Sequence, residues 1–583
     1  MNGHSAQIPP DVRVCATVFN GKGRLFHRKL ARGGGREFHA VGVGGGGCGT
    51  RVMKSLSLLL LFTASVAAAE RFDVVVYGGT AGGAIAAVSA ARAGMRVALL
   101  EPGRHLGGMV SGGLSATDVG KKEVIGGYAL EFYLRAGRHY DMAQYGQEAA
   151  WRMEPHVAEE ILRQMLRDAG VTVMMEHRLR EKDGVTKTGA TIRQITMESG
   201  ATFGASVFVD SSYEGDLMAQ AGVSYTLGRE GTSQYGESLA GVRGKSKGHQ
   251  FEINLPPFDA KGNLLPEIDR GPRGELGAAD RKVQAYNYRL CFSDDPANQT
   301  PFTKPEGYNP ERYELLARLL QARLQAEGAA PKVDTLLIII HVPNHKVDVN
   351  NKGAFSTDYL GASWSYPNAS YERRDRIRQA HKDYTAGLLY FLANDAQVPA
   401  ETRKEMNQWG LCKDEFTDSG NWPFQLYIRE ARRMVGEFVM TQKDLQTELG
   451  KPDAIGMGSY NSDSHNVDRI VDSDGFVRNE GNMEVPVQPY QIPYRVMLPK
   501  RGEAANLLVP VAFSASHVAY SSLRMEPQYM ILGQAAGEAA AMSVRRKCAV
   551  QEIDTGALSE ALRKHGAVME YVPSAVNASS DFR

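Results

Sequence analysis

The 583-residue sequence predicts an α/β fold, in which a discontinuous Rossmann-like dinucleotide-binding domain is interrupted by an inserted α+β region. Three observations predict it. A β-branched apolar strand over 72–77 leads into a glycine turn and a helix of small residues. A second apolar strand, over 96–100, ends at an acid. Near the C-terminus another helix of small residues, over 528–545, follows a short strand. The two ends of this pattern are expected to form one domain.

The glycine turn occupies the place of a pyrophosphate-binding turn. Gly78 and Gly83 hold the first and third positions of G-x-G-x-x-G, while Thr80 stands where the second glycine lets the backbone approach phosphates. The amides after Gly78 and Gly79 are expected to face a pyrophosphate at the start of the helix. Glu101, 23 residues after Gly78, is placed to accept from a ribose hydroxyl. An ordinary βαβ turn is the alternative, and the register of strand, helix and acid favours nucleotide binding.

Composition excludes several functional classes. The chain carries 67 basic and 66 acidic residues, a net charge of +1, which gives no electrostatic argument for nucleic acid or an anionic membrane. Only Cys291, Cys412 and Cys548 follow residue 69, and C-x-x-C is absent. Four-cysteine iron–sulfur and zinc sites are therefore excluded, and we predict no metal site. One disulfide is compatible with an exported protein and would leave an odd thiol.

The N-terminal part predicts export. Residues 53–69 contain a short basic start, an apolar core and an A-x-A site, as in a secretory signal peptide, and the core is too short to span a bilayer. A buried N-terminal helix is the alternative. No twin arginine precedes the core, which favours a Sec-type route to the periplasm or the exterior. Residues 1–52 lack helical or strand periodicity and are interpreted as a non-native or disordered extension.

We place the first part of the dinucleotide domain at 70–225, the inserted region at 226–500 and the second part with the C-terminal tail at 501–583. Helices are predicted over 131–138, 154–168, 371–394 and 423–441, a β-meander over 184–208, and strands over 171–175, 336–342 and 506–511, the strand over 336–342 being buried. The stretch 513–527 is predicted as a connection.

Several motifs together resemble the FAD-dependent oxidoreductase family of the glutathione-reductase-like flavoproteins, which is grouped with the flavoprotein A subunit of heterodisulfide reductase. They cover the chain from Phe72 to about Val544 and include VVVYGGTAGG, EPGRHLGGMVSGG, VDSSYEGDLMAQAGV, YIREARRMVGE, GSYNSDSHN and SSLRMEPQYMILGQAAG. The cluster-binding cysteines of the heterodisulfide reductase subunits are missing from this chain.

The resemblance implies FAD as the cofactor and assigns residues to it. Glu101 would bind the adenosine ribose, and the segment 110–113 would approach the isoalloxazine. The further contacts that it implies are Arg104, Gly107, Gly108, Asp210, Met525 and Pro527. The helix that begins near Pro527 would point its positive end at the pyrimidine side of the flavin.

Flavin oxidation of an alcohol or amine requires a base for the accompanying proton. His517 is the first candidate, with a backbone-bonded loop histidine as its alternative. Arg524 is suited to a carboxylate or polarised oxygen, or to a structural contact.

Three weaker groups of candidates lie in the inserted region. One set of charged residues is predicted on a single helix, where Arg429 and Arg433 face the site and Glu430 points elsewhere; a salt-bridged helix face is the alternative. Arg432 belongs to this first group. The second group is the polar cluster His345, Lys346, Asn350 and Asn351, and the third is His465.

The predicted function is oxidation or reduction of a small, polar organic substrate by hydride transfer involving flavin N5, with the electron acceptor unknown. A hydroxylated compound such as a sugar is compatible with the inserted region. One alternative is an electron-transfer flavoprotein subunit that serves a redox partner. Another is a non-catalytic secreted binding protein on a degenerate dinucleotide fold. NAD in place of FAD is a lesser alternative. No membrane span is expected in the mature chain.

Overall fold

A seven-stranded sheet carries the predicted dinucleotide fold. The computed structural model describes residues 69–271 and 273–573. The strand order is β3-β2-β1-β6-β5-β4, with β20 pairing β6 on the side. The strands β3, β2, β1, β6 and β20 run parallel, and the meander β4-β5 turns back antiparallel. The strands are β1 (Glu70–Tyr77), β2 (Val97–Leu100), β3 (Thr172–Met174), β4 (Val185–Thr188), β5 (Thr191–Thr196), β6 (Thr202–Asp210) and β20 (Leu507–Leu508).

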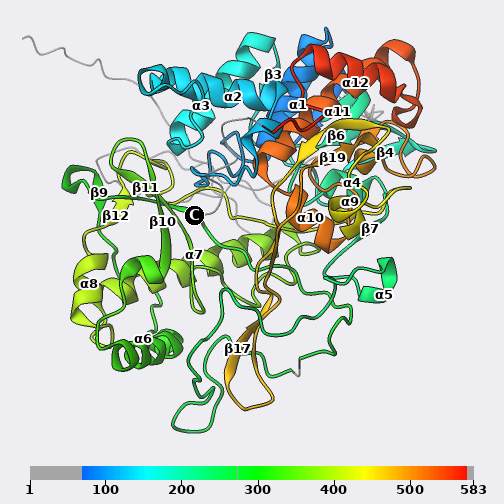
Figure 1. Cartoon of the computed structure of the whole chain (residues 1–583). Coiled ribbons are helices and arrows are strands. Elements are labelled where there is room, and N and C mark those ends of the chain that lie inside the picture. The colour runs from blue at the N-terminus through cyan, green and yellow to red at the C-terminus, as the bar shows by residue number, and fades with distance from the viewer. Residues whose placement is uncertain (1–68, 272, 574–583) are drawn as a thin grey trace, which may run out of the picture. The chain divides into compact units, whose positions relative to one another are not determined.

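Two helices of small residues lie side by side against this sheet (Figure 1), α1 (Ala81–Arg92) and α11 (Glu526–Arg546). A Cβ added to Gly533 would lie 2.1 Å from the carbonyl oxygen of Gly82, and one on Gly537 would lie 2.4 Å from that of Ala86. The backbones are therefore in direct contact, which is possible only because both α11 positions lack a side chain. The helices α2 (Gly127–His139), α3 (Pro155–Ala169) and α12 (Thr555–Lys564) complete this part.

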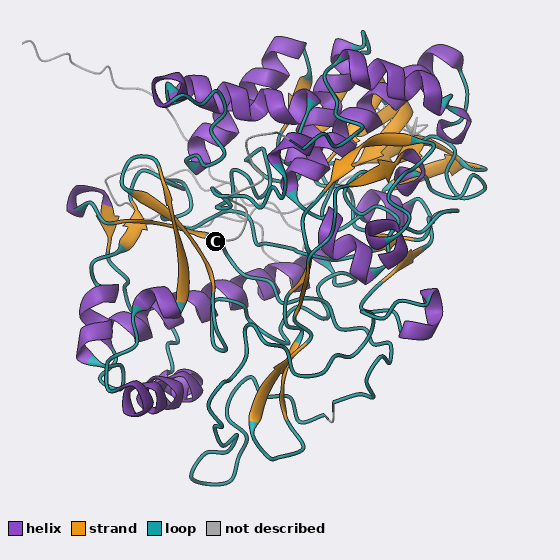
Figure 2. Ribbon diagram, in the orientation of Figure 1, coloured by secondary structure: helices purple, strands orange, loops and turns teal. Residues whose placement is uncertain are grey.

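The predicted inserted region contains a second, antiparallel sheet of order β10-β11-β8-β12-β9. Loops, teal in Figure 2, make up much of this region. One hydrophobic cluster includes residues of both sheets, from Val74 to Met569. The elements of the second sheet and its helices are β8 (Leu290–Ser293), β9 (Gln299–Thr300), β10 (Leu337–Val342), β11 (Lys346–Asn351), β12 (Gly410–Cys412), α6 (Glu314–Glu327), α7 (Tyr371–Asn394) and α8 (Ala400–Met406).

Short elements make up the rest of the described chain. The remaining helices are α4 (Asp216–Gln220), α5 (Thr232–Tyr235), α9 (Gln442–Gln446) and α10 (His517–Leu523). The remaining strands form the pairs β7 (Tyr225–Thr226) with β13 (Arg433–Met434), β14 (Ala454–Gly458) with β19 (Tyr490–Pro493), β15 (Ser462–Ser464) with β18 (Met483–Val485), and β16 (Asp468–Val471) with β17 (Val477–Glu480).

The helix predicted over 423–441 is wrong. This segment is irregular apart from β13, and residues 426–434 are buried without the 3.6-residue alternation of a surface helix. The reason is that its charged side chains are internal: Arg429 pairs with Asp358, and Arg433 pairs with Glu230. Arg429 and Arg433 therefore do not lie one helical turn apart.

Two further elements differ from expectation. The strand predicted as buried over 336–342 is the edge strand β10, whose central isoleucines are half-exposed. The predicted connection over 513–527 contains the short helix α10, because Ser516 caps it by accepting from the Ala519 amide at 3.2 Å.

The predictions for residues 1–52 and for almost all of 53–69 lie outside the described residues, and the domain boundaries stay predictions. Within the described ranges, no helix combines the length and the apolar character that a membrane crossing requires.

The contact between α1 and α11 yields a prediction. In Gly533→Val, the new side chain must displace the Gly82 backbone, so we expect a markedly lower melting temperature and loss of bound nucleotide cofactor. Thermal unfolding and the cofactor content of the purified protein measure both. Gly502→Ala is the matched control, because no atom lies within 4 Å of its added Cβ. A Gly533→Val protein as stable as that control would contradict the packing argument.

Candidate active site

The glycine turn between β1 and α1 is held in shape by Thr80. Its hydroxyl accepts from the Gly83 amide at 3.1 Å, which caps α1, and donates to the Ser211 carbonyl at 2.9 Å. Gly78 has a φ of +97°, and a Cβ there would lie 2.7 Å from the Ser212 amide nitrogen. A Cβ on Gly79 would lie 2.6 Å from Leu106. The threonine in the second motif position therefore ties the turn to the end of β6.

Glu101 closes the same turn from the end of β2. Its two carboxylate oxygens accept from the amides of Gly79 at 2.7 Å and Gly103 at 2.6 Å. Burial disfavours the charged form and raises the pKa of Glu101 to about 7, against the lowering effect of the two amides. Each oxygen retains a lone pair, so the carboxylate can also accept from a ribose hydroxyl.

A pocket of about 250 Å³ opens beside this turn. Of the predicted cofactor residues, it is lined by Gly78, Thr80, Glu101, Arg104 and Gly108. A second set of lining residues, not predicted from the sequence, lies on α7: Tyr371, Arg374 and Arg378. The spacing of these residues on one face of a correctly predicted helix was the available signal.

Gly107 and Asp210 shape the walls rather than line this pocket. Gly107 has a φ of +99°, and its amide donates to the Gly79 carbonyl at 2.7 Å. The Asp210 carboxylate accepts from the Ser212 hydroxyl at 2.7 Å and from the Met218 amide at 2.7 Å. Burial raises the pKa of Asp210 to about 6. Asp210 therefore orders the loop between β6 and α4.

The start of α11 presents unpartnered polar groups. Met525 is its N-cap and supplies no side-chain cap, and Pro527 occupies the first turn, as predicted. One carboxylate oxygen of Glu526 and both polar atoms of the Gln528 amide are buried without a partner. Burial raises the pKa of Glu526 to about 8, so its carboxyl is largely protonated at neutral pH. Buried polar groups are rarely left unpaired.

The polar groups at the two ends of the site match those that an extended dinucleotide such as FAD requires. One end of the site offers the Glu101 carboxylate and the amides at the start of α1. The other end offers the uncapped amides of α11 beside the unpartnered Gln528 side chain. The contact between Gly82 and Gly533 brings the two helices together. The donor and acceptor set fits a cofactor with a nucleotide at one end and a polar ring at the other.

Arg524 contacts residues of the predicted inserted region. Its guanidinium donates to the Tyr427 hydroxyl at 3.1 Å and to the Asp463 carbonyl at 2.8 Å, and its side chain is 1% exposed. Its Nε is buried and unpartnered. Burial raises the pKa of Asp118, although the charges of Arg289 and Arg524 act to lower it.

His465, which directly follows β15, forms a pair with Asp358. This pair lies next to Asp463 of β15. His465 Nδ1 is 2.7 Å from Asp358 Oδ2, and Arg429 pairs with Asp358 at 3.0 Å. Burial, with the Arg429 charge, lowers the pKa of His465 to about 4. The charge of Arg429 and the hydrogen bond from His465 hold the pKa of Asp358 at about 2 despite burial. His465 is thus neutral at neutral pH, with Nδ1 donating to an ionised carboxylate.

His517 is fully engaged by its neighbours. Its Nδ1 is 2.8 Å from Glu430 Oε2, and its Nε2 is 3.0 Å from the Ser464 hydroxyl. Burial, with the charge of Arg433, lowers the pKa of His517 to about 3. Glu430, expected to point away, is therefore central to this network and also pairs with Arg433.

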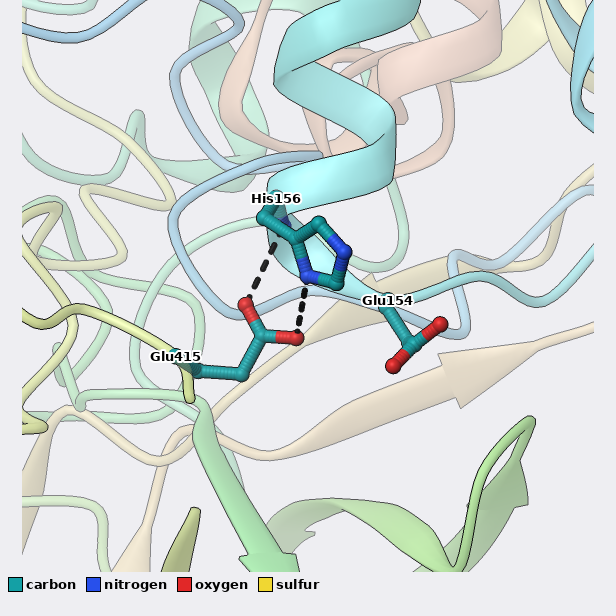
Figure 3. A group of neighbouring side chains, drawn as sticks. All are labelled: Glu154, His156 and Glu415. Atoms are coloured by element: carbon teal, nitrogen blue, oxygen red, sulfur yellow. Dashed lines mark hydrogen bonds and ion pairs between the residues drawn. The ribbon is translucent and has the colours of Figure 1, made fainter. Parts of the chain in front are cut away.

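Glu154, His156 and Glu415 form a group that could hold a metal ion (Figure 3), with ligand atoms within 4.8 Å of one another. His156, at the start of α3, points toward Glu415, and its Nδ1 lies 2.7 Å from Oε1 of that residue. The buried ammonium of Lys346 pairs with Glu154 at 2.6 Å and with Glu415 at 2.7 Å. This ammonium already supplies the positive charge that the carboxylates require.

The other members of the predicted polar cluster do not gather at one site. His345 is 79% exposed at its side chain, whereas Asn351 is buried, 3.4 Å from an Arg429 nitrogen. Arg432 bonds Asp216 at 2.7 Å, on the side of the pocket that is lined by Arg374.

The model of the family described as FAD dependent oxidoreductase matches residues 73–562. No curated protein matches the sequence. Among solved structures, THI4 of Thermovibrio ammonificans shares 19% identity over 27% of this chain and 66% of its own, with a TM-score of 0.20. T. acidophilum thioredoxin reductase shares 22% over 28% and 40%, with a TM-score of 0.16. A triple mutant of the flavin-dependent brominase Bmp2 shares 10% over 85% and 84%, with a TM-score of 0.33. The chain spans less than two thirds of the first two of these structures.

Glu101 yields a pH prediction. Its pKa of about 7 in the folded protein lies above the ordinary value of a glutamate, so its stabilising contribution is present at low pH. That contribution is lost as pH rises through about 7. In the cofactor-free protein, we therefore expect the melting temperature of wild type, relative to that of Glu101→Gln, to fall between pH 5 and pH 8. This range spans the pKa of about 7 that Glu101 has in the folded protein. An unchanged difference across this range would contradict the assignment.

Proposed function

The chain belongs to the FAD dependent oxidoreductase family, and from that premise we propose that it oxidises a small, polar, uncharged organic substrate by hydride transfer to flavin N5. The observation that carries the proposal is the polar cluster of Arg524, Tyr427, Asp358 and His465, next to the start of α11. Bound FAD supplies the two-electron acceptor for this chemistry.

The chain's own residues would hold the cofactor at both ends. Glu101 accepts from the adenosine ribose, and the amides at the start of α1 face the pyrophosphate. The α11 amides and the Gln528 side chain bond the polar edge of the ring. Support comes from the pocket beside Glu101 and from the unpartnered, buried atoms of Gln528.

His465 is proposed as the base that accepts the substrate proton. Asp358 accepts from Nδ1, which leaves Nε2 as the free acceptor, and Nε2 lies 3.9 Å from the Asp463 carboxylate. The imidazole is already neutral at neutral pH, as a base must be. The ion pair between Arg429 and Asp358 fixes the orientation of the carboxylate behind it.

His517 and Arg524, the candidates from the sequence, receive different roles in this proposal. His517 has both ring nitrogens bonded, so it would position Ser464 and strand β15 rather than take a proton. Arg524 retains an unpartnered Nε, which can donate to a substrate oxygen.

The charge balance of the cluster favours an uncharged substrate. In and beside the cluster, three buried arginines have aspartate partners: Arg289 with Asp348, Arg429 with Asp358, and Arg524 with Asp463. No surplus positive charge is therefore left to bind a carboxylate. The buried hydroxyls of Ser115 and Thr117, which lack partners, can bond to hydroxyl groups. Together they support a hydroxylated compound.

Anaerobic flavin reduction tests the proposal. The purified holoprotein is mixed with neutral polyols and sugars, with amines and with carboxylates of similar size, and flavin absorbance is followed. We expect reduction by members of the neutral hydroxylated group without any partner protein. Reduction by carboxylates or amines alone would contradict the proposed substrate class.

His465→Asn yields a sharper prediction with the substrate so identified. Removing the base is expected to slow flavin reduction by about 100-fold or more while leaving flavin content unchanged. Wild type is expected to lose rate as pH falls toward about 4, and the variant to lose that dependence.

His341→Asn, on the exposed part of β10, is the matched control and is expected to reduce at the wild-type rate. A His465→Asn protein with the wild-type rate and pH profile would remove His465 from the reaction.

A further inference from the structure

Two of the three described cysteines face each other across neighbouring strands of the second sheet. Strands β8 and β12 pair antiparallel, with Ser293 opposite Gly410 and Phe292 opposite Leu411. Continuing this register places Cys291 opposite Cys412. The two sulfur atoms are 3.0 Å apart, and both residues are buried, with exposed fractions of 2% and 0%.

The strand geometry suits a covalent link. Directly opposed residues of antiparallel strands have Cα atoms about 4.5–5.5 Å apart, which lies inside the range of about 4.4–6.8 Å found for disulfides. The bond can therefore form without moving either strand. Cys548 follows the end of α11 and is half-buried. Among the interactions of the described residues, none joins its sulfur to Cys291 or Cys412.

We propose that Cys291 and Cys412 form a structural disulfide across β8 and β12, with Cys548 as the remaining thiol. The bond forms by exchange with the disulfide of an oxidant, either a protein of the thiol–disulfide oxidoreductase class or a small-molecule disulfide. One cysteine thiolate displaces a thiol of the oxidant to give a mixed disulfide. The second cysteine then displaces the other thiol, so the protein loses two hydrogens and the oxidant gains them.

Burial determines when this chemistry takes place. Thiolate is the attacking species, and burial raises the pKa of the Cys291 thiol. Exchange therefore belongs to the folding chain, before β8 and β12 close over the sulfurs. In the folded protein the bond lies out of reach of reductants, which makes it structural rather than a switch.

The position of the bond gives it a large effect on the second sheet. Cys291 and Cys412 are 121 positions apart, and the loop that they close contains β9 to β11 and α6 to α8. Closing a long loop removes conformational entropy from the unfolded chain. Arg289 directly precedes β8 and forms an ion pair with Asp348 on β11. The Asp348 carboxylate also accepts from the amide of Ala116. The disulfide thus stabilises the sheet that supports this wall of the proposed substrate site.

The proposal agrees with the signal peptide predicted over 53–69, because exported proteins meet disulfide oxidants and cytosolic ones rarely do. It does not depend on the substrate or on the proposed base.

Peptide mapping of the full-length chain, produced with its own N-terminal segment, tests the bond. The protein is denatured in acid, its thiols are blocked with N-ethylmaleimide, and it is digested without reduction. We expect one linked peptide pair containing Cys291 and Cys412, and maleimide on Cys548. Maleimide on both Cys291 and Cys412 would overturn the proposal if it also persisted after refolding with oxidised and reduced glutathione.

Serine variants supply an independent measurement. Cys291→Ser and Cys412→Ser are expected to lower the melting temperature by equal amounts, and the double variant by no more than either one. Cys548→Ser is the matched control and is expected to melt as wild type does. The same melting temperature for wild type refolded with or without a phosphine reductant would overturn the proposal.

Discussion

The backbone contact between α1 and α11 is the constraint on which the site depends. Gly533 and Gly537 let α11 approach the carbonyls of Gly82 and Ala86, and the Ser89 hydroxyl donates to Gln534 across the same contact. This contact joins segments more than 400 positions apart in the chain. It brings the start of α1, the predicted pyrophosphate contact, together with the uncapped start of α11, so that residues of both chain ends are available to one extended cofactor.

The local parts of this arrangement were predictable from the sequence. The strand, glycine turn and helix up to Arg92 follow from apolar runs and small residues, and Glu101 ends β2 as expected. The amphipathic α3 and the long α7 were likewise confirmed, because each has a continuous helical pattern. These elements depend on neighbours within one turn or one strand.

The polar cluster was not predictable in the same way, because its contacts join distant segments. Arg429 pairs with Asp358, which in turn contacts His465, and Glu430 contacts His517. Arg429 and Glu430 lie in an irregular buried segment that the sequence predicted to be a helix. Buried ion pairs cost desolvation and are stable only when each charge is partnered, which periodicity along the chain cannot reveal. Thr80 is similar, since its bond to Ser211 appears only once β6 lies beside β1.

Identification of the bound nucleotide tests the central claim most directly. The full-length protein is purified, denatured and freed of protein, and the released cofactor is identified by its mass and quantified by its absorbance against the protein concentration. An account in which one end of the site holds an adenosine ribose and the other a polar ring predicts FAD, in a ratio of about one per chain at full occupancy. Release of FMN, which lacks the adenosine half, or of NAD, or a colourless protein that does not take up added FAD, would contradict it.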